Sequence, residues 1–213
     1  ERGNLIVISG PSGAGKGTIV DGLKNVNENI WVSISMTSRE PRKNDIPDET
    51  YFFVSREEFE ERISRGEFLE YAIYNENYYG TPRDKIAHKL EQGYDVVLEI
   101  EIQGALKVKE LVDDAIFIFI LPPSMRELRN RLVNRGTDSK EKILNRFKRA
   151  YQEINEVTKY NYVVINDDID KAVKKVNAIL LSERCRVDRI EDVYLNNMEE
   201  VVHELLIDKE FEN

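Results

Sequence analysis

The chain has 213 residues and is 41% hydrophobic, so it is long enough for one α/β domain with insertions or two small domains. Its 31 Lys and Arg residues against 40 Asp and Glu residues give a net charge of −9, which argues against a general nucleic-acid or anionic-membrane surface. The single Cys185 excludes an internal disulfide, and the sequence shows neither a run of the ~20 apolar residues that span a membrane nor a secretory signal. We therefore expect a cytoplasmic protein.

A glycine-rich loop follows the first predicted strand, residues 5–8. The spacing G-x-x-x-x-G-K allows several backbone N–H groups to point at one anion, and Lys16 adds a positive charge. A helix that opens at Thr18 would direct its N-terminal dipole at the same anion. A plain turn is the alternative, but the flanking strand and helix favour a site for nucleotide phosphates. The loop comprises Gly10, Pro11, Ser12, Gly13, Ala14, Gly15, Lys16, Gly17 and Thr18.

Position 17 departs from the usual pattern of such a loop. Gly17 stands where a Ser or Thr normally ligates Mg²⁺, and the first hydroxyl comes one residue later, at Thr18. We predict that Mg²⁺ is held mainly by phosphate oxygens and by water, which this ion retains because it dehydrates reluctantly.

Four more short apolar runs, rich in β-branched residues, predict buried strands, and segments with helical spacing separate several of them. Such alternation is typical of a parallel sheet with helices on its faces. Ligands of these sheets gather at the carboxyl ends of the strands, where the glycine-rich loop lies. The runs are residues 30–34, 96–100, 116–121 and 162–165.

Residues 35–93 break this alternation. Residues 51–54 and 68–74 predict extended segments, and residues 56–65 predict a helix rich in Glu and Arg. A further helix opens at Thr81, a good N-cap that is followed by proline. We expect a small α+β insertion between two strands of the sheet.

Residues 124–158 are a second departure and predict two helices. Ser124 with Glu127 three residues later is a capping box at the start of the first helix, and Gly136 suits its end. The last segment, residues 187–213, has apolar residues at helical spacing and predicts a docked helix without a sign of chemistry.

Two arginines lie three residues apart shortly after the second predicted strand. Pro41 biases Glu40 to an extended conformation, so Arg39 and Arg42 could approach one phosphate as a pair of rigid forks. When the segment is taken alone, a solvated charged loop explains the same residues equally well.

Several further motifs follow the glycine-rich loop in order. They are S-x-T-S-R-x-P-R from Ser35, Y-F-F from Tyr51, F-L-E-Y from Phe68, N-Y-Y-G-T from Asn77, E-I-E-x-Q-G-A from Glu99, I-F-I-L-P-P-S from Ile118, R-L-x-x-R-G from Arg131 and V-I-N-D-D from Val164. In these motifs and their order the chain resembles the guanylate kinases, from residue 5 to about residue 186.

The resemblance implies an α/β P-loop kinase fold in which a parallel sheet core flanked by helices carries a nucleotide-monophosphate-binding α+β insertion and a helical lid. It implies one guanylate kinase-like domain that transfers the γ-phosphate of ATP reversibly to GMP, and to dGMP, with Mg²⁺ as cofactor, in purine nucleotide metabolism. ATP and GMP would be the partners, without nucleic acid or membrane; a monomer and a homo-oligomer both remain open. The core would comprise residues 1–34, 94–123 and 159–186, the insertion residues 35–93, the lid residues 124–158, and the tail residues 187–213.

By this resemblance, five residues of the insertion would bind the GMP phosphate, and Glu70 and Thr81 would bind guanine. A carboxylate accepts hydrogen bonds from N1–H and the amino group of guanine, whereas N1 of adenine presents a lone pair. Core packing of the tyrosines, a solvated strand end at Glu70 and helix capping by Thr81 are the competing explanations. The phosphate set is Ser35, Arg39, Arg42, Tyr51 and Tyr79.

Glu99 and Glu101 end a predicted buried strand beside the expected phosphates, where carboxylates need a counter-ion. We expect them to contact Mg²⁺ through water, with Thr18 as a further candidate ligand, although the family commonly has Asp at both positions. Glu101 has a second candidate role at the guanine amino group. A solvated strand end is the plain alternative.

The resemblance assigns Arg131, Arg135 and Arg146 of the lid to the transferring phosphates. Arg131 lies four residues after Glu127 and could instead form a surface pair on the helix, and Arg135 suits a helix C-terminus. Arg146 has Lys142 four residues before it, a like-charge spacing that a bound anion would relieve.

Catalysis would need alignment and charge neutralisation, because the attacking GMP phosphate is already an anion and requires no general base. Asn166 would lie near the adenine of ATP, although helix capping explains it almost as well. The catalytic set is Lys16, Arg39, Arg135 and Arg146, and ATP would contact the glycine-rich loop, Arg131, Arg135 and Asn166.

Two other functions compete with this one. An adenylate kinase also favours a loop that ends in G-K-G-T, but the S-x-T-S-R-x-P-R and N-Y-Y-G-T motifs do not belong to it. A non-catalytic guanylate-kinase-like module that binds phosphoproteins typically loses the phosphate loop, whereas Gly10, Gly15 and Lys16 are intact here. These features favour the enzyme.

Overall fold

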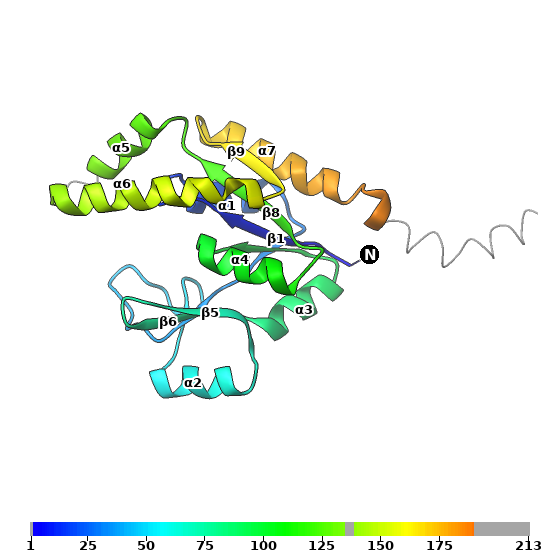
Figure 1. Cartoon of the computed structure of the whole chain (residues 1–213). Helices are drawn as coiled ribbons and strands as arrows, with labels where there is room; N and C mark the ends of the chain where they lie inside the picture. Colours follow the sequence, from blue (N-terminus) through cyan, green and yellow to red (C-terminus); the bar gives the residue numbers. More distant parts are fainter. Residues whose placement is uncertain (1, 135–138, 190–213) are drawn as a thin grey trace, which may run out of the picture. The chain divides into compact units, whose positions relative to one another are not determined.

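The computed structural model describes residues 2–134 and 139–189 (Figure 1). Contacts divide the chain into two units, residues 1–176 and residues 177–213. The first unit contains two sheets, one of five strands in the order β2-β7-β1-β8-β9 and one of four strands in the order β4-β3-β6-β5. The mixed α/β class predicted from the sequence is therefore confirmed.

The five-stranded sheet is parallel throughout. The strand predicted over residues 30–34 ends earlier, at Val32, and the one predicted over residues 96–100 begins one residue earlier, at Asp95. Asp95 is buried because its carboxylate accepts a hydrogen bond from the Asn4 N–H (2.8 Å), a pairing that hydropathy does not reveal. The strands are β1 (Leu5–Ser9), β2 (Ile30–Val32), β7 (Asp95–Glu99), β8 (Ile116–Leu121) and β9 (Tyr162–Ile165).

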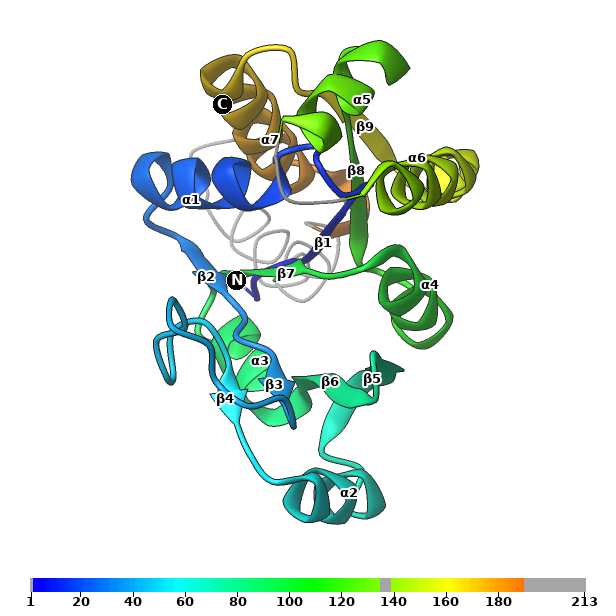
Figure 2. The same cartoon turned by 90° about the vertical axis from the view of Figure 1, so that its left-hand side faces the viewer.

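Helices cover both faces of this sheet, with α1 and the part of α7 up to Val176 on one side and α4 on the other (Figure 2). Gly22 of α1 lies against the early part of α7, since a Cβ at Gly22 would be 2.7 Å from Val173 Cγ2. The opposite face carries Ile86 and Ala105 in one buried apolar cluster with β1 and β7. These helices are α1 (Lys16–Val26), α3 (Arg83–Glu91), α4 (Ile102–Leu111) and α7 (Ile169–Glu183).

The segment predicted as an insertion forms the four-stranded sheet. Phe59 from α2 stacks on Phe68 and Tyr78, with ring centres 4.4 and 4.9 Å away, and so fixes α2 to the β5–β6 hairpin. The prediction that Thr81 caps the following helix is wrong, because Thr81 lies in β6 and Pro82 is the N-cap residue of α3. The elements are β3 (Met36–Thr37), β4 (Phe52–Phe53), α2 (Arg56–Ser64), β5 (Phe68–Tyr74) and β6 (Asn77–Pro82).

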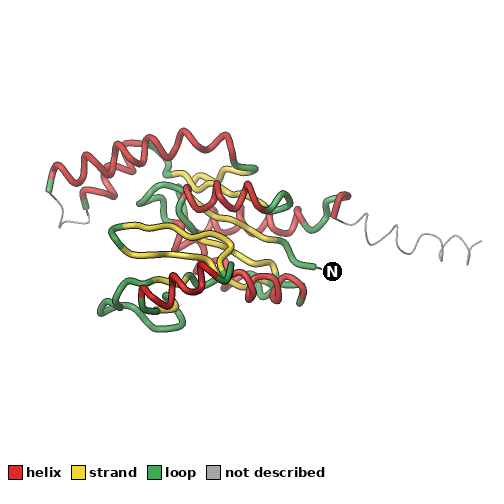
Figure 3. Tube along the Cα trace, turned by 60° about the horizontal axis from the view of Figure 1, so that its bottom comes forward, coloured by secondary structure: helices red, strands yellow, loops and turns green. Residues whose placement is uncertain are grey.

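The two helices predicted after Ser124 run side by side (Figure 3). Ser124 Oγ accepts the Glu127 N–H (3.1 Å), which confirms the N-cap of the first helix. Leu128 and Ala150 belong to the apolar cluster between the helices. Gly136, the predicted helix stop, lies outside the described residues. The elements are α5 (Met125–Val133), α6 (Lys140–Ile154) and the 3₁₀ helix η1 (Asn155–Lys159).

In the second unit, α7 ends at Glu183, whose carboxylate accepts hydrogen bonds from Arg186 (3.3 Å) and Arg189 (3.4 Å). Cys185 is exposed. The tail helix predicted within residues 187–213 lies largely outside the described residues. Within the described part of the chain, no helix has the length and apolar character needed to cross a membrane.

Candidate functional site

The glycine-rich loop joins β1 to α1 at the carboxyl end of the parallel sheet. Gly13 and Gly15 have φ values of 87° and 89°, in the left-handed region that other residues rarely adopt. Gly15 is the N-cap residue of α1, so the helix begins at Lys16 and not at Thr18 as predicted. The N–H groups of the first turn of α1 therefore face the loop, as an anion site requires.

Close contacts with distant residues determine the course of the loop. Asn166, which is buried after β9, donates its side-chain N–H to the Ala14 carbonyl (2.8 Å). A Cβ at Gly15 would lie 2.4 Å from the same Asn166 nitrogen, and a Cβ at Gly10 would lie 2.3 Å from the Ile120 carbonyl oxygen. Space thus requires glycine at both positions, and the left-handed conformation is a second reason at Gly15.

Arg131 of α5 joins this cluster. It pairs with Glu127 (3.2 Å), which confirms the surface pair on the helix, and it also donates to the carbonyl oxygens of Gly13 and Asn166 (3.3 Å each). The guanidinium group therefore already contacts the backbone of the phosphate loop.

The alternative role of Asn166 as a helix cap is wrong. Asp168, two residues later, accepts the Lys171 N–H (2.9 Å) at the start of α7. The Asn166 amide is turned to the loop, and its Oδ1 is buried without a hydrogen-bond partner among the described residues. The Asn166 side chain thus holds the peptide group between Ala14 and Gly15 by a hydrogen bond.

Three of the predicted phosphate-binding residues, Arg39, Tyr51 and Tyr79, lie together. The Arg39 guanidinium lies over the rings of Tyr51 and Phe53, 5.3 and 5.6 Å from their centres. Tyr51 in turn meets Tyr79 edge to face at 5.9 Å. Burial raises the pKa of Tyr51, so its hydroxyl group keeps its proton and can donate at neutral pH.

Asp45, which belongs to none of the sequence motifs, is the partner of Arg39. Its Oδ2 lies 2.8 Å from Nη1 and its Oδ1 lies 3.3 Å from Nη2. Arg42 contributes its backbone N–H, 2.6 Å from the same Oδ2. The only sequence signal for Asp45 is an acidic residue six positions after Arg39.

Ser35, another residue predicted to bind the phosphate, lies just before β3, where its carbonyl accepts the Phe52 N–H (2.9 Å).

Glu70 and Thr81 face each other across the β5–β6 hairpin. The Thr81 hydroxyl donates to Glu70 Oε1 (2.8 Å), and a Cβ at Gly104 would lie 3.1 Å from Oε2, so the carboxylate lies against the first turn of α4. Desolvation raises the pKa of Glu70, while the Thr81 hydrogen bond and Lys107 oppose the shift. The alternative of a solvated strand end is therefore wrong.

Glu99 and Glu101 have different surroundings. The Glu99 carboxylate lies beside α1, since a Cβ at Gly17 would be 3.5 Å from its Oε1, and desolvation raises its pKa despite the attraction of Lys16. Glu101 is the exposed N-cap residue of α4, 3.9 Å from Arg149 Nη2. The described residues contain no group of three or more His, Cys, Asp or Glu side chains that could hold a metal ion.

The other two arginines that the sequence assigns to a lid are Arg135 and Arg146. Arg146 is exposed on α6, and Arg135 lies outside the described residues. Arg149, also on α6, lies over the Tyr74 ring of β5 (5.4 Å) and pairs with Glu153 (2.7 Å). The helix pair α5–α6 thus contacts both the phosphate loop and the insertion.

Thr18, the further candidate ligand of Mg²⁺, is exposed on α1.

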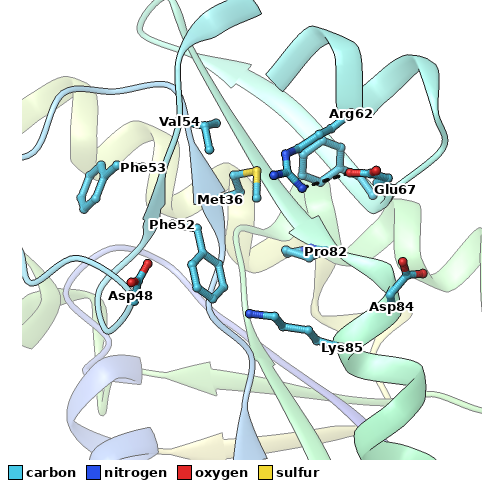
Figure 4. Close-up of a pocket in the computed structure, with 11 residues that line it drawn as sticks. Met36, Asp48, Phe52, Phe53, Val54, Arg62, Glu67, Pro82, Asp84 and Lys85 are labelled. Atoms are coloured by element: carbon cyan, nitrogen blue, oxygen red, sulfur yellow. Dashed lines mark hydrogen bonds and ion pairs between the residues drawn. The ribbon is translucent and has the colours of Figure 1, made fainter. Parts of the chain in front are cut away.

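A cavity of about 410 Å³ lies elsewhere on the insertion (Figure 4). Phe52 projects into it beside Lys85, whose Nζ lies 4.0 Å from the ring centre. Phe53 leaves the other side of β4 and faces Arg39. Phe53 also lines the cavity, so the cavity borders the Arg39 cluster.

Comparison with known proteins agrees with the motifs. The family model described as guanylate kinase matches residues 2–183. The chain is 54% identical to the guanylate kinase of Clostridium tetani, over 98% of this chain and 100% of that one, and 57% identical to that of Caldanaerobacter subterraneus, over 95% and 98%. The crystal structure of guanylate kinase from Anaplasma phagocytophilum matches with a TM-score of 0.73 and 35% identity, over 88% of this chain and 89% of that one. Matched along nearly its whole length, the chain belongs to the guanylate kinase family and has the P-loop kinase fold.

Proposed function

We propose that this chain transfers the γ-phosphate of ATP reversibly to GMP, and to dGMP, in the cytoplasm. The observation that carries the proposal is that one unit holds both a backbone-lined phosphate loop and an arginine–tyrosine cluster, each suited to one phosphate group. Membership of the guanylate kinase family favours this reaction over that of an adenylate kinase and over a binding module without catalysis.

ATP would bind with its phosphates in the loop from Gly10 to Thr18. Backbone N–H groups and Lys16 would contact the phosphate oxygens, while Asn166 holds the loop backbone from the other side. Arg131 lies at the same loop and would reach the phosphates by a short movement of its side chain.

GMP would bind on the insertion. Arg39 and Arg42 would neutralise its phosphate, and the hydroxyl groups of Ser35, Tyr51 and Tyr79 would donate hydrogen bonds to the phosphate oxygens. Charge-assisted hydrogen bonds of this kind are the strong ones in proteins, so a few of them suffice for a dianion.

Guanine would be read by Glu70 and Thr81. The Thr81 hydroxyl already donates to Glu70 Oε1, which orients the carboxylate toward the first turn of α4. An ionised carboxylate matches N1–H and the amino group of guanine, whereas adenine would leave it facing a lone pair. Glu101, at the start of α4, is a further candidate for the amino group.

Mg²⁺ would enter with ATP, held mainly by phosphate oxygens and water. Glu99 fits a nearby cation, because its carboxylate is exposed at the end of β7 and lies beside the first turn of α1. Glu101 and Thr18 are the other residues placed to contact its water shell. When bound, the ion neutralises charge on the transferring phosphates.

Transfer itself would require alignment and charge neutralisation, without a general base. Lys16, Arg39, Arg135 and Arg146 would screen the two phosphates from each other and stabilise the charge on the transferred group. The helix pair and the insertion would close over both nucleotides to exclude water, which would otherwise hydrolyse ATP.

The proposed reaction is tested by measuring ADP formation from ATP with GMP, dGMP, AMP or UMP as acceptor. We expect GMP to be the best acceptor, with dGMP next and AMP lower by about 10²-fold or more, because discrimination rests on hydrogen bonds to the base. No turnover with GMP, or a preference for AMP, would contradict the proposal.

A further inference from the structure

The Arg39–Asp45 pair is closely fitted and largely removed from water. The Arg39 and Asp45 side chains are 11% and 10% exposed, and the carboxylate binds Nη1 and Nη2 of the guanidinium at 2.8 and 3.3 Å. The Arg42 backbone N–H is a third donor to this carboxylate, at 2.6 Å. These contacts hold the pKa of Asp45 below its ordinary value, chiefly through Arg39, so Asp45 is an anion at neutral pH.

The pair uses only one edge of the guanidinium. Nη1 donates to Asp45 and to the Glu40 carbonyl (3.0 Å), and Nη2 donates to Asp45; the Tyr79 hydroxyl is a further hydrogen-bond partner of the guanidinium. A guanidinium has five N–H donors, so Nε–H and the second N–H of Nη2 form another fork on the adjacent edge. That fork matches two oxygens of a phosphate.

Aromatic rings further restrict the movement of the Arg39 side chain. Tyr51 and Phe53 pack against the guanidinium face, and the Tyr79 hydroxyl is near enough to help raise the pKa of Arg39, after the larger effect of Asp45. The guanidinium is thus held by a carboxylate at one edge and by aromatic rings on its face. The two tyrosines assigned to the phosphate therefore lie beside this guanidinium.

We propose that Asp45 is a positioning residue for the GMP phosphate, because it binds one edge of Arg39 and presents the adjacent edge to the ligand. This inference rests on the proposed function, in which Arg39 binds GMP. Asp45 stays on Arg39 when GMP is bound, so that the guanidinium bridges two anions. A carboxylate that merely occupied the phosphate site would have to leave, and its removal would then strengthen GMP binding.

The test is Asp45→Asn, which keeps the size of the side chain but removes its charge and turns an amide donor toward the guanidinium. We expect the KM for GMP to rise about tenfold, the KM for ATP to stay within about twofold, and inhibition by guanosine, which has no phosphate, to be unchanged. Asp45→Glu restores a carboxylate and should recover most of the affinity. Asp48→Asn is the matched control in the same loop and should behave as wild type, since asparagine tolerates its φ of 64°.

A double variant shows whether Asp45 acts through Arg39. In an Arg39→Met background, Asp45→Asn should weaken GMP binding no further. An unchanged or lower KM for GMP in Asp45→Asn would overturn the inference, as would a full tenfold loss in the Arg39→Met background. If Arg39→Met itself leaves GMP binding intact, the proposed function fails as well; if Arg39→Met weakens GMP and Asp45→Asn does not, only the role of Asp45 fails.

Discussion

The phosphate loop and the Arg39 cluster both suit anions, but the loop is made of backbone and the cluster of side chains. The loop follows the buried strand β1 and is held from behind by Asn166. The cluster lies on a sheet whose strands β3 and β4 have two residues each, and Arg39 is oriented by other side chains. The loop therefore depends on its glycines and on one charged side chain, Lys16, whereas the cluster depends on every partner of its charged group.

The same contrast holds for charge. The whole chain carries a net charge of −9, so each anion site must be locally positive against an acidic background. The loop meets this need with Lys16 and the first turn of α1, and the insertion meets it with guanidinium groups. Substitutions at the two sites should therefore affect different nucleotides.

The largest effect is expected at Lys16. Lys16→Met removes the charge at the loop but keeps an unbranched side chain at the start of α1, so turnover should fall by about 10³-fold without loss of the fold. Steady-state kinetics and circular dichroism measure the two quantities. Lys24→Met, on the same helix and exposed beside Asp21, is the control and should retain activity. Comparable turnover in both variants would remove Lys16 from the mechanism.

Glu70→Gln should produce the next largest effect. The amide presents a donor where guanine also donates, so kcat/KM for GMP should fall on the order of 10²-fold while the KM for ATP stays near the wild-type value. The same change at Glu67, which pairs with Arg62 nearby on the insertion, should leave GMP use intact. Unchanged GMP kinetics in Glu70→Gln would exclude Glu70 as the guanine reader.

Asn166→Ala tests the support behind the loop. Loss of the hydrogen bond to the Ala14 carbonyl should raise the KM for ATP about tenfold and leave the KM for GMP nearly unchanged. Asp168→Ala removes the cap of α7 and should lower the Tm without this change in KM. If both variants lower the Tm and neither changes the KM for ATP, Asn166 only stabilises the fold.

The smallest effect concerns stability and pH. The folded state raises the pKa of Glu70 by desolvation, so the folded protein binds a proton more readily than the unfolded chain, and the wild type loses stability as the pH rises through these two pKa values. Glu70→Gln should therefore have a higher Tm than wild type at pH 7, with a difference that shrinks toward pH 4. Thermal unfolding across this range checks the sign. A Tm difference that grows toward acid pH would mean that the carboxylate is stabilised in the folded state.

Much of the fold follows from local pattern. Residues 116–121 are apolar without interruption, as expected for a strand covered on both faces, and they form β8 unchanged. Edge strand β2 is shorter than its apolar run because it pairs on one side only, with β7. The prediction at Thr81 fails because of a long-range contact. Threonine is a favourable N-cap residue, but the Thr81 hydroxyl instead donates a hydrogen bond to Glu70 across the hairpin.

The site is harder to predict from the sequence than the fold, because the contacts that support it join residues far apart in the chain. Asn166 and Ala14 are 152 positions apart, and no periodicity connects them. Asp45 lies only six residues from Arg39, but its role depends on a turn that brings the Arg42 N–H to the same carboxylate. Motifs in the sequence therefore indicate Arg39 and Asn166 as site residues. Their partners, Asp45 and the Ala14 carbonyl, are identified only from the structure.

The most direct measurement is the separate binding of ATP and of GMP to wild type, Lys16→Met and Arg39→Met by calorimetry. We predict that Lys16→Met weakens ATP binding by about tenfold or more and leaves GMP binding nearly unchanged, and that Arg39→Met does the reverse, since one buried charge contact is worth at least this factor. If both variants weaken the same nucleotide, or if Arg39→Met leaves GMP binding intact, the division into a backbone site for ATP and a side-chain site for GMP is contradicted.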